Sequence, residues 1–189
     1  SATGIVHTQG FQLGNGLVLI TYTSSGSLPS AAGPITGSNS VCPGSTVTYS
    51  ISSVTGATGY NWTVPVGTVI NSGQNTTSIN VTFGTTSGNI TVTTTNLCGS
   101  GPSSSLAVTV NPNPTVNLGP DVTQCGGTVL LDAQNAGSSY FWSTGATTQT
   151  ITVNTSGTYS VTVTSTLGCT GTDMINVLLN TLPGVNLGN

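Results

Sequence analysis

Three aspartates and one histidine are the side chains to consider first for catalysis. Asp121, Asp132 and Asp173 are the only acidic residues of the 189-residue chain, and His7 is its only histidine. A serine–histidine–aspartate arrangement would need His7 to meet a distant aspartate, because no acidic residue precedes Asp121. Two-carboxylate glycoside hydrolysis has only these three aspartates available, and Asp132 ends an apolar run where a turn or capping role fits better. We therefore expect no catalytic residue and no enzyme activity.

Asp121 and Asp173 are the candidates for a metal site. Each lies four residues outside the segment between Cys125 and Cys169. A disulfide between these two cysteines would bring both carboxylates toward one end of a domain. Two carboxylates and backbone carbonyls suit Ca²⁺, which takes six to eight oxygen ligands. The alternative is a pair of solvated loop acids, and we expect no other cofactor.

The charge inventory excludes several classes of partner. The chain has no lysine or arginine, a formal net charge of −3 and 2% charged residues. Nucleic-acid binding needs cations that neutralise phosphates, and Schiff-base chemistry needs an amine side chain. A basic membrane-surface patch fails for the same reason, and the sequence contains no run of 18 apolar residues. We therefore expect neither nucleic-acid binding nor membrane insertion.

The chain has four cysteines, Cys42, Cys98, Cys125 and Cys169. None is in a Cys-x-x-Cys pair, and a single histidine does not make a zinc cluster. An even number of cysteines in a chain rich in Thr, Ser, Gly and Asn favours disulfides and an extracellular or cell-surface location. The alternative is four free buried thiols.

Two segments of the sequence share one order of landmarks, which indicates a tandem repeat. The order is cysteine, strand, Tyr-x-Trp, strand, a strand that follows glycine, and cysteine. It runs from Cys42 to Cys98 in the first copy and from Cys125 to Cys169 in the second. The predicted parts are residues 1–26, a strand segment; 27–111 and 112–180, the two repeats; and 181–189, a linker and possible start of a third repeat.

The repeats consist of short strands. Residues 46–51, 79–83, 151–153 and 159–163 alternate apolar and polar side chains with a period of two. No segment shows an apolar period of 3.6 residues with helix caps. Short strands separated by turns predict antiparallel β-sandwiches, and one tryptophan on the third strand of each fits the immunoglobulin plan. We expect Cys42 to pair with Cys98 and Cys125 with Cys169, each pair closing most of one domain.

The aromatic residues could indicate either a core or a sugar-binding face. Tyrosine and tryptophan two residues apart on a strand share a face, and in a sandwich that face is normally the core. We expect a core role for Tyr60, Trp62, Tyr140 and Trp142. Tyr159 is expected to be a packing or tyrosine-corner residue.

The N-terminal segment holds the most apolar run, residues 17–23. A lone strand needs a partner, and the candidates are the first sandwich, a missing upstream domain or a neighbouring subunit. The residues available for strand exchange with a second subunit are Leu17, Val18, Leu19, Ile20 and Tyr22. The chain also lacks the lysines that commonly guard sheet edges, so either other devices protect the edges or the edges serve in assembly.

The landmarks resemble the PKD-like, immunoglobulin-type repeats of large Bacteroidota surface proteins, including gliding-motility adhesins exported by the type IX secretion system. The resemblance covers residues from about 33 to 180. It is carried by residues 41–45, 59–65, 96–99, 118–121, 140–145 and 157–163. Residues 14–22 are similar to the closing strand of the glycine-rich region that often precedes such repeats. Trp142-Ser143-Thr144-Gly145 departs from the aspartate-rich motif of typical PKD domains.

The resemblance implies a stalk, spacer or adhesive role outside the cell. We expect an all-β chain of two tandem immunoglobulin-like (PKD-like) antiparallel sandwiches with an N-terminal strand segment. The expected partners are neighbouring repeats, identical subunits or surface glycans. The alternatives are a filament subunit assembled by β-strand addition and a glycan- or calcium-dependent binding module.

Overall fold

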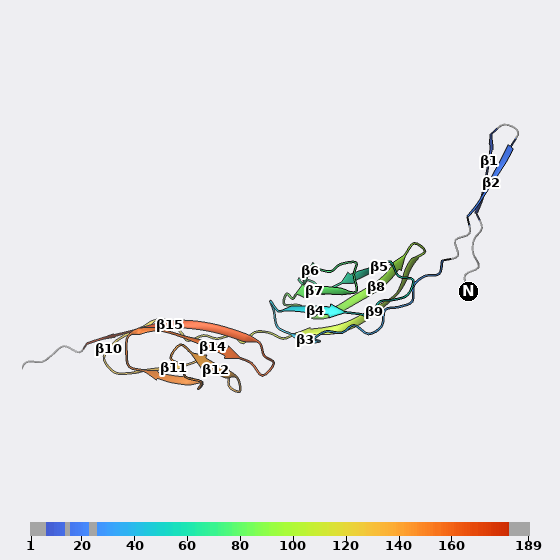
Figure 1. Ribbon diagram of the computed structural model, residues 1–189. Helices are drawn as coiled ribbons and strands as arrows, with labels where there is room; N and C mark the ends of the chain where they lie inside the picture. The colour runs from blue at the N-terminus through green and yellow to red at the C-terminus, as the bar shows by residue number, and fades with distance from the viewer. Residues whose placement is uncertain (1–6, 14–15, 23–25, 182–189) are drawn as a thin grey trace, which may run out of the picture. The chain divides into compact units, whose positions relative to one another are not determined.

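The computed structural model describes the backbone of residues 7–13, 16–22 and 26–181 and the side chains of residues 26–181 (Figure 1). Fifteen β-strands lie in these ranges, and no α-helix does. In particular, none of the described segments is a helix that could cross a membrane. The predicted all-β class is confirmed.

The N-terminal strand segment forms a two-stranded sheet. Strand β1 (His7–Leu13) pairs antiparallel with β2 (Gly16–Tyr22), with Leu13 opposite Gly16. The apolar run therefore pairs within its own chain, but its partner is the segment that directly precedes it. Strand exchange remains a prediction, and the side chains named for it lie outside the described residues: Leu17, Val18, Leu19, Ile20 and Tyr22.

The first sandwich has a four-stranded and a three-stranded sheet. The strand order of the larger sheet is β3-β9-β8-β5 and that of the smaller is β4-β7-β6. The bounds of the larger sheet are β3 (Ser40–Val41), β9 (Gly99–Val110), β8 (Gly88–Asn96) and β5 (Gly59–Thr63). Those of the smaller sheet are β4 (Thr46–Ser50), β7 (Ser78–Thr82) and β6 (Val69–Ser72).

The second sandwich repeats this plan with a smaller second sheet. Its strand orders are β10-β15-β14-β12 and β11-β13. The bounds are β10 (Val122–Cys125), β15 (Thr170–Asn180), β14 (Gly157–Thr164) and β12 (Ser139–Trp142). The remaining two are β11 (Val129–Asp132) and β13 (Thr150–Val153).

The first strand of each sandwich runs parallel to its last strand, which the expectation of antiparallel sandwiches did not include. Val41 of β3 lies opposite Val110, and Cys125 of β10 lies opposite Asn180. All other strand pairs are antiparallel. No hairpin joins the first and last strands, so no tight turn imposes an antiparallel direction on them.

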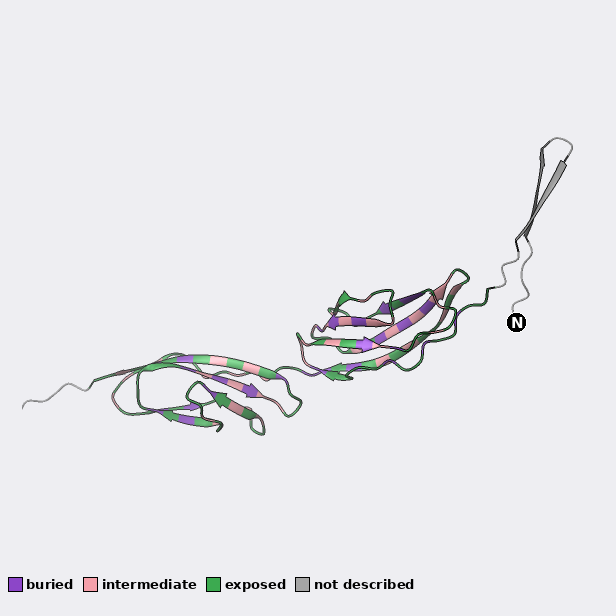
Figure 2. Cartoon of the chain, viewed as in Figure 1, coloured by how far each residue is buried: buried purple, intermediate pink, exposed green. Residues whose placement is uncertain are grey.

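The cores follow from the period-two alternation of the strands (Figure 2). In β8 the buried residues are Ile90, Val92 and Thr94, and in β14 they are Tyr159, Val161 and Val163. Successive side chains of a strand point to opposite faces, so one face of each strand lies in the core.

Tyr49 on β4 is a fully buried aromatic residue that sequence analysis did not single out. Its hydroxyl donates a hydrogen bond to the carbonyl of Ser38. Burial raises the pKa of Tyr49 to about 12, because the charged phenolate is poorly solvated there. The alternation of residues 46–51 places Tyr49 on the same face as Ile51, which is also buried, and this signal could have identified it.

The chain divides into two compact units whose limits do not follow the sequence continuously. The first unit is Ser1–Asn39, Thr46–Thr82 and Thr86–Val108. The second is Ser40–Ser45, Phe83–Thr85 and Thr109–Asn189. Two short segments from the first sequence repeat therefore belong to the second unit, and one of them carries Cys42.

Candidate functional site

The two aspartates proposed for calcium bind backbone and amide groups of the protein itself. Both carboxylate oxygens of Asp121 accept hydrogen bonds from Asn176, one from its backbone N–H at 2.9 Å and one from its Nδ2 at 3.0 Å. Asp173 Oδ2 accepts the backbone N–H of Leu118 at 2.7 Å. The hydrogen bonds from Asn176 hold the pKa of Asp121 below its usual value, since they favour the charged form.

The two carboxylates engage opposite faces of β15. Asp173 and Asn176 are three residues apart on this strand, so their side chains point to different faces. Asp121 binds the side chain of Asn176 and so lies away from Asp173. No group of three or more His, Cys, Asp or Glu side chains gathers anywhere in residues 26–181. The calcium site remains a prediction, without the disulfide from which it was argued.

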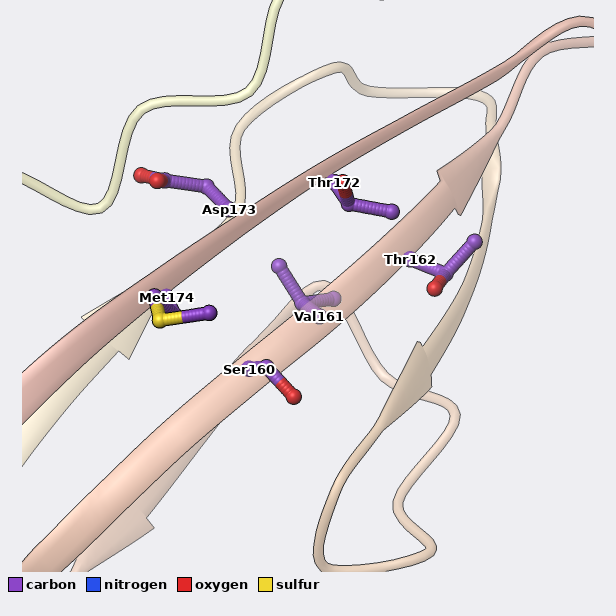
Figure 3. Close-up of a pocket in the computed structure, with 6 residues that line it drawn as sticks. All are labelled: Ser160, Val161, Thr162, Thr172, Asp173 and Met174. Carbon is purple, nitrogen blue, oxygen red and sulfur yellow. The ribbon is translucent and has the colours of Figure 1, made fainter.

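Asp173 is one of six residues on β14 and β15 that line a pocket (Figure 3). Its lining residues are Ser160, Val161, Thr162, Thr172, Asp173 and Met174. Asp173 points away from the hydroxyl groups of Ser160 and Thr162, as expected for neighbouring residues on opposite faces of paired strands. The six lining residues include one carboxylate, which already accepts a hydrogen bond from Leu118, and no second acidic or basic side chain.

Asp132 closes a turn at the end of β11. Its Oδ1 accepts hydrogen bonds from the backbone N–H of Gln134 at 2.7 Å and from Gln149 Nε2 at 2.9 Å. These hydrogen bonds, with that of Gln149 contributing most, lower the pKa of the Asp132 carboxyl. Asp132 therefore has the turn or capping role that was expected for it.

The two tryptophans lie in the cores of the sandwiches. Trp62 is 2% exposed and its Nε1 donates to the carbonyl of Thr76 at 2.8 Å. Trp142 is fully buried and its Nε1 donates to the carbonyl of Thr148, also at 2.8 Å. Neither ring is available to stack on a sugar, and each satisfies its single donor, as a buried tryptophan requires.

The three tyrosines of the predicted set bond to nearby backbone. The Tyr60 hydroxyl accepts the backbone N–H of Val54 at 3.0 Å. The Tyr140 hydroxyl lies 2.8 Å from the carbonyl of Gln134, to which it donates. Tyr159 donates to the carbonyl of Thr155 at 2.9 Å, four residues upstream, which is the arrangement of a tyrosine corner. Tyr60 and Tyr159 are buried and Tyr140 packs against the core of the second sandwich.

The cysteines do not pair as expected. Cys42 forms a disulfide with Cys169, across 127 residues and with 5.4 Å between the Cα atoms. Cys98 and Cys125 are free and exposed. Both expected bridges, Cys42–Cys98 and Cys125–Cys169, are therefore wrong. The physical reason is that the segment Ser40–Ser45 packs within the second unit, so the loop after β3 meets the loop before β15.

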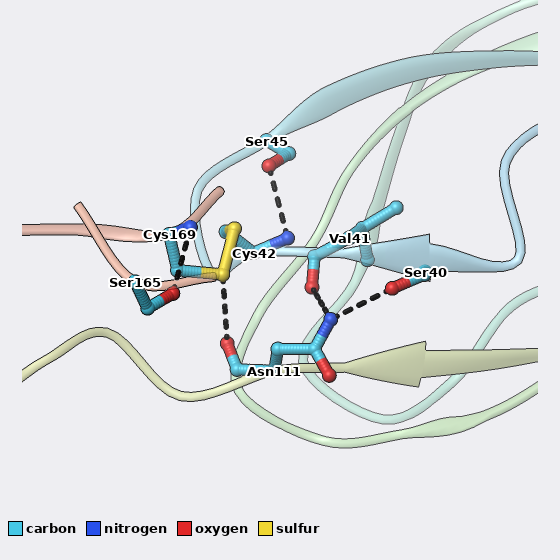
Figure 4. The surroundings of a disulfide bond; sticks show 7 residues. All are labelled: Ser40, Val41, Cys42, Ser45, Asn111, Ser165 and Cys169. Carbon is cyan, nitrogen blue, oxygen red and sulfur yellow. Dashed lines mark hydrogen bonds between the residues drawn. A yellow bond between two sulfur atoms is a disulfide. The ribbon is translucent and has the colours of Figure 1, made fainter. Parts of the chain in front are cut away.

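Backbone and side-chain contacts hold both ends of this bridge (Figure 4). The Cys42 N–H donates to Ser45 Oγ at 3.2 Å, and the Cys169 N–H donates to Ser165 Oγ at 3.2 Å. Cys169 Sγ lies 3.5 Å from the carbonyl oxygen of Asn111, which is a packing contact because a disulfide sulfur carries no proton. Cys169 is 1% exposed, so the bridge is protected on that side.

Asn111, the last residue of the first predicted repeat, is a polar residue at this site that the sequence did not single out. It is 8% exposed, and its Nδ2 donates to Ser40 Oγ at 2.8 Å and to the carbonyl of Val41 at 3.3 Å. Its backbone N–H donates to the same carbonyl at 2.8 Å. Asn111 thus fixes the end of β3 beside the bridge, and asparagine directly before a proline was the only signal for it.

The edge strands of the two sandwiches are short, which protects them without lysine, whereas β1 and β2 of the two-stranded sheet have seven residues each. In the four-stranded sheets the edge strands are two to five residues long, whereas the inner strands are eight to twelve. In the smaller sheet of the first sandwich, edge strand β6 pairs irregularly between Ile70 and Ser72. Short and irregular edges offer few unpaired backbone groups to another strand.

Residues 28–108 match the family model of a PKD-like domain. This match covers the first sandwich, and the same strand plan recurs in the second. No curated protein matches the sequence. The chain is thus a tandem of two β-sandwiches, and the first of them is similar to a PKD-like domain.

Several solved structures resemble the chain at low sequence identity. The insect immune protein hemolin is 14% identical, with 94% of this chain and 55% of that chain covered and a TM-score of 0.46. A C-terminal fragment of intimin is 16% identical, with 79% and 64% covered and a TM-score of 0.45. The eight N-terminal immunoglobulin domains of DSCAM are 11% identical, with 91% and 30% covered and a TM-score of 0.38. The chain spans about half of the hemolin structure.

Proposed function

We propose that this chain is a non-enzymatic structural segment, a stalk or spacer, of a large extracellular surface protein of the Bacteroidota gliding-adhesin type. Immunoglobulin-like and PKD-like domains are typical of extracellular adhesion proteins or structural repeats. A structural disulfide favours an oxidising compartment outside the cell. The partners in this proposal are further repeats of the same protein.

The observation that carries the proposal is the covalent path through the Cys42–Cys169 bridge. A force applied between the two ends of the chain passes from Cys42 directly to Cys169. The backbone between the two cysteines, which are 127 residues apart in the sequence, therefore carries no force. Most of both sandwiches can then unfold without lengthening the chain, which suits a spacer that must hold its length.

The chemistry of the described residues agrees with a passive role. Asp121, Asp132 and Asp173 each accept hydrogen bonds from backbone N–H groups. The tryptophans are buried, so they supply neither a sugar platform nor an exposed adhesive patch. The short edges of the two sandwiches give little support to strand addition there, so the alternative of a filament assembled by strand addition rests on the β1–β2 sheet.

Single-molecule stretching of the chain between its first and last residues tests the proposal. We expect the oxidised chain to extend only through the residues outside the bridge. The C42S/C169S variant should extend further by roughly 430 Å, at about 3.4 Å for each of the 127 residues that the bridge spans. Equal extension of both chains would overturn the proposal.

The alternative functions have their own readouts. Helical fibres of the pure chain in electron micrographs would favour the filament. Binding on a glycan array, or a melting temperature that rises with millimolar calcium, would favour a binding module. The spacer predicts monomeric particles, no glycan binding and no calcium response.

A further inference from the structure

The two free cysteines occupy the same places in their repeats as the two bridged ones. Cys125, like Cys42, stands at the end of the first strand of its sandwich. Cys98, like Cys169, lies in the hairpin loop that leads into the last strand. The bridge thus joins the first-strand cysteine of one sequence repeat to the hairpin cysteine of the next.

The strand register supports the equivalence of Cys42 and Cys125. Val41 lies opposite Val110, so Cys42 follows at the level of Asn111, while Cys125 lies opposite Asn180. Backbone hydrogen bonds continue both ladders by one step: Asn111 N–H donates to Val41 O at 2.8 Å, and Gly126 N–H donates to Asn180 O at 2.8 Å. Asn180 therefore stands beside Cys125 as Asn111 stands beside Cys42.

The chain entering each repeat passes the hairpin cysteine in the same way. Gly101 and Gly171 have no room for a Cβ because the carbonyl oxygens of Pro29 and Pro114, respectively, lie against them. Three residues before Pro114, the Asn111 carbonyl lies 3.5 Å from Cys169 Sγ. Three residues before Pro29, a Cβ on Gly26 would collide with Cys98 Sγ.

Gly26 therefore takes the place beside Cys98 that Asn111 takes beside Cys169. Asn111 is hydrogen-bonded to Val41, the last residue of β3, and the next residue, Cys42, forms the disulfide with Cys169. The sequence has this spacing a third time, since Pro183 follows Asn180 by three residues. Asn180, which lies beside Cys125, therefore begins the same three-residue spacing to a proline that Gly26 and Asn111 begin.

We propose that Cys98 and Cys125 are the two open halves of inter-repeat disulfides of the Cys42–Cys169 type. Cys98 accepts the first-strand cysteine of a preceding PKD-like repeat, and Cys125 accepts the hairpin cysteine of a following one. Residues 1–41 and 170–189 contain no cysteine, so the partner thiols belong to other repeats or other copies. The proposal rests on the spacer function and deepens it, because each further bridge would add a covalent link between neighbouring repeats.

Each new bridge needs an oxidant. A disulfide donor such as oxidised glutathione takes the two electrons and two protons of the two cysteine thiols. It leaves as two reduced thiols while the cysteine sulfurs form their bond. An oxidising compartment outside the cell supplies donors of this class.

A tandem chain tests the proposal directly. The first copy ends at Asn180, and a second copy, residues 27–189, follows it directly. Leu28 and Pro29 of the second copy then stand where Leu182 and Pro183 follow Asn180 in the original chain. After refolding with oxidised glutathione, we expect a monomer with two free thiols per tandem, because Cys125 of the first copy bonds to Cys98 of the second. Peptide mapping after chymotrypsin should show that bridge beside two intact Cys42–Cys169 bridges. Trypsin has no site in a chain without lysine or arginine.

Matched variants give the control and the refutation. Replacing Cys125 by serine in the first copy alone should leave three free thiols, and the same change in the second copy should leave one. Four free thiols in the unchanged tandem, with both Cys42–Cys169 bridges intact, would overturn the proposal. So would a Cys98–Cys125 bridge inside one copy.

A second arm distinguishes linked repeats from separate copies. The single variants C98S and C125S of the 189-residue chain are oxidised separately and as a mixture. If separate copies also pair, the mixture should form a Cys98–Cys125 heterodimer in excess over either homodimer. Heterodimer formation assigns the partner to another copy, and a bridge only in the tandem assigns it to the same chain. Neither readout involves force, so failure of the spacer proposal and failure of this one are distinguishable.

Discussion

The C42S/C169S variant should lower the free energy of unfolding by about 5 kcal/mol if the bridge acts through the unfolded chain. In the loop-entropy model the stabilisation depends on the logarithm of the number of residues enclosed, here 127. If Thr46–Thr82 and Thr86–Val108 of the first unit stay folded while the second unit unfolds, the effective loop is about half as long. The stabilisation then falls only to about 4 kcal/mol, because the dependence is logarithmic.

Guanidinium unfolding at equilibrium measures this difference, with both chains in a C98S/C125S background to prevent thiol exchange. Trp62 and Trp142 lie in different cores, so W62F and W142F derivatives report the two sandwiches separately by fluorescence. We expect the core of Trp142 to lose most stability, because both bridged cysteines belong to the second unit. A loss below about 1 kcal/mol in both sandwiches would refute the reasoning from chain entropy. An unchanged second sandwich with a destabilised first one would refute the assignment of Cys42.

The remaining predictions concern single side chains. The T94V variant should lose about 1–3 kcal/mol in urea unfolding, because it leaves the Ser30 carbonyl without the hydroxyl that donates to it at 2.7 Å; an unchanged midpoint would contradict this. W142F should cost about 2–4 kcal/mol, since it opens a gap in the core and removes the donor to Thr148 O, and a change below about 1 kcal/mol would show that the site repacks. The pKa of Asp121 is lowered in the folded chain, so its contribution is present above the unfolded value and lost as pH falls through the folded one. The melting temperature should therefore fall in acid and stay level above about pH 6, and D121N should reduce the acid-induced fall; an identical pH profile would contradict the role of Asp121.

The local elements were predictable from the residues alone. Period-two alternation depends only on neighbouring side chains, so it identified strands such as Thr46–Ser50 and Gly157–Thr164 and their buried faces. The spacing of Tyr60 and Trp62 on one face followed from the same geometry, and both are buried. The repeat order also predicted a tandem of sandwiches, since the landmarks recur in sequence.

Long-range pairing was not predictable in this way. The apolar run of β2 could be recognised as a strand in need of a partner, but the weakly patterned β1 (His7–Leu13) gave no signal that it was that partner. The parallel pairing of β3 with β9 likewise depends on a register between residues about 69 apart. Neither is visible in a window of neighbouring residues.

The sequence by itself determined that this chain is an all-β tandem of sandwiches with cysteines near the ends of its strands. Only the tertiary structure decided which cysteines meet. A disulfide needs Cα atoms within about 4.4–6.8 Å, and that distance depends on how Ser40–Ser45 packs with Thr109–Asn189. Counting cysteines within one repeat favoured Cys42–Cys98, whereas packing placed Cys42 at 5.4 Å from Cys169 and left Cys98 and Cys125 free.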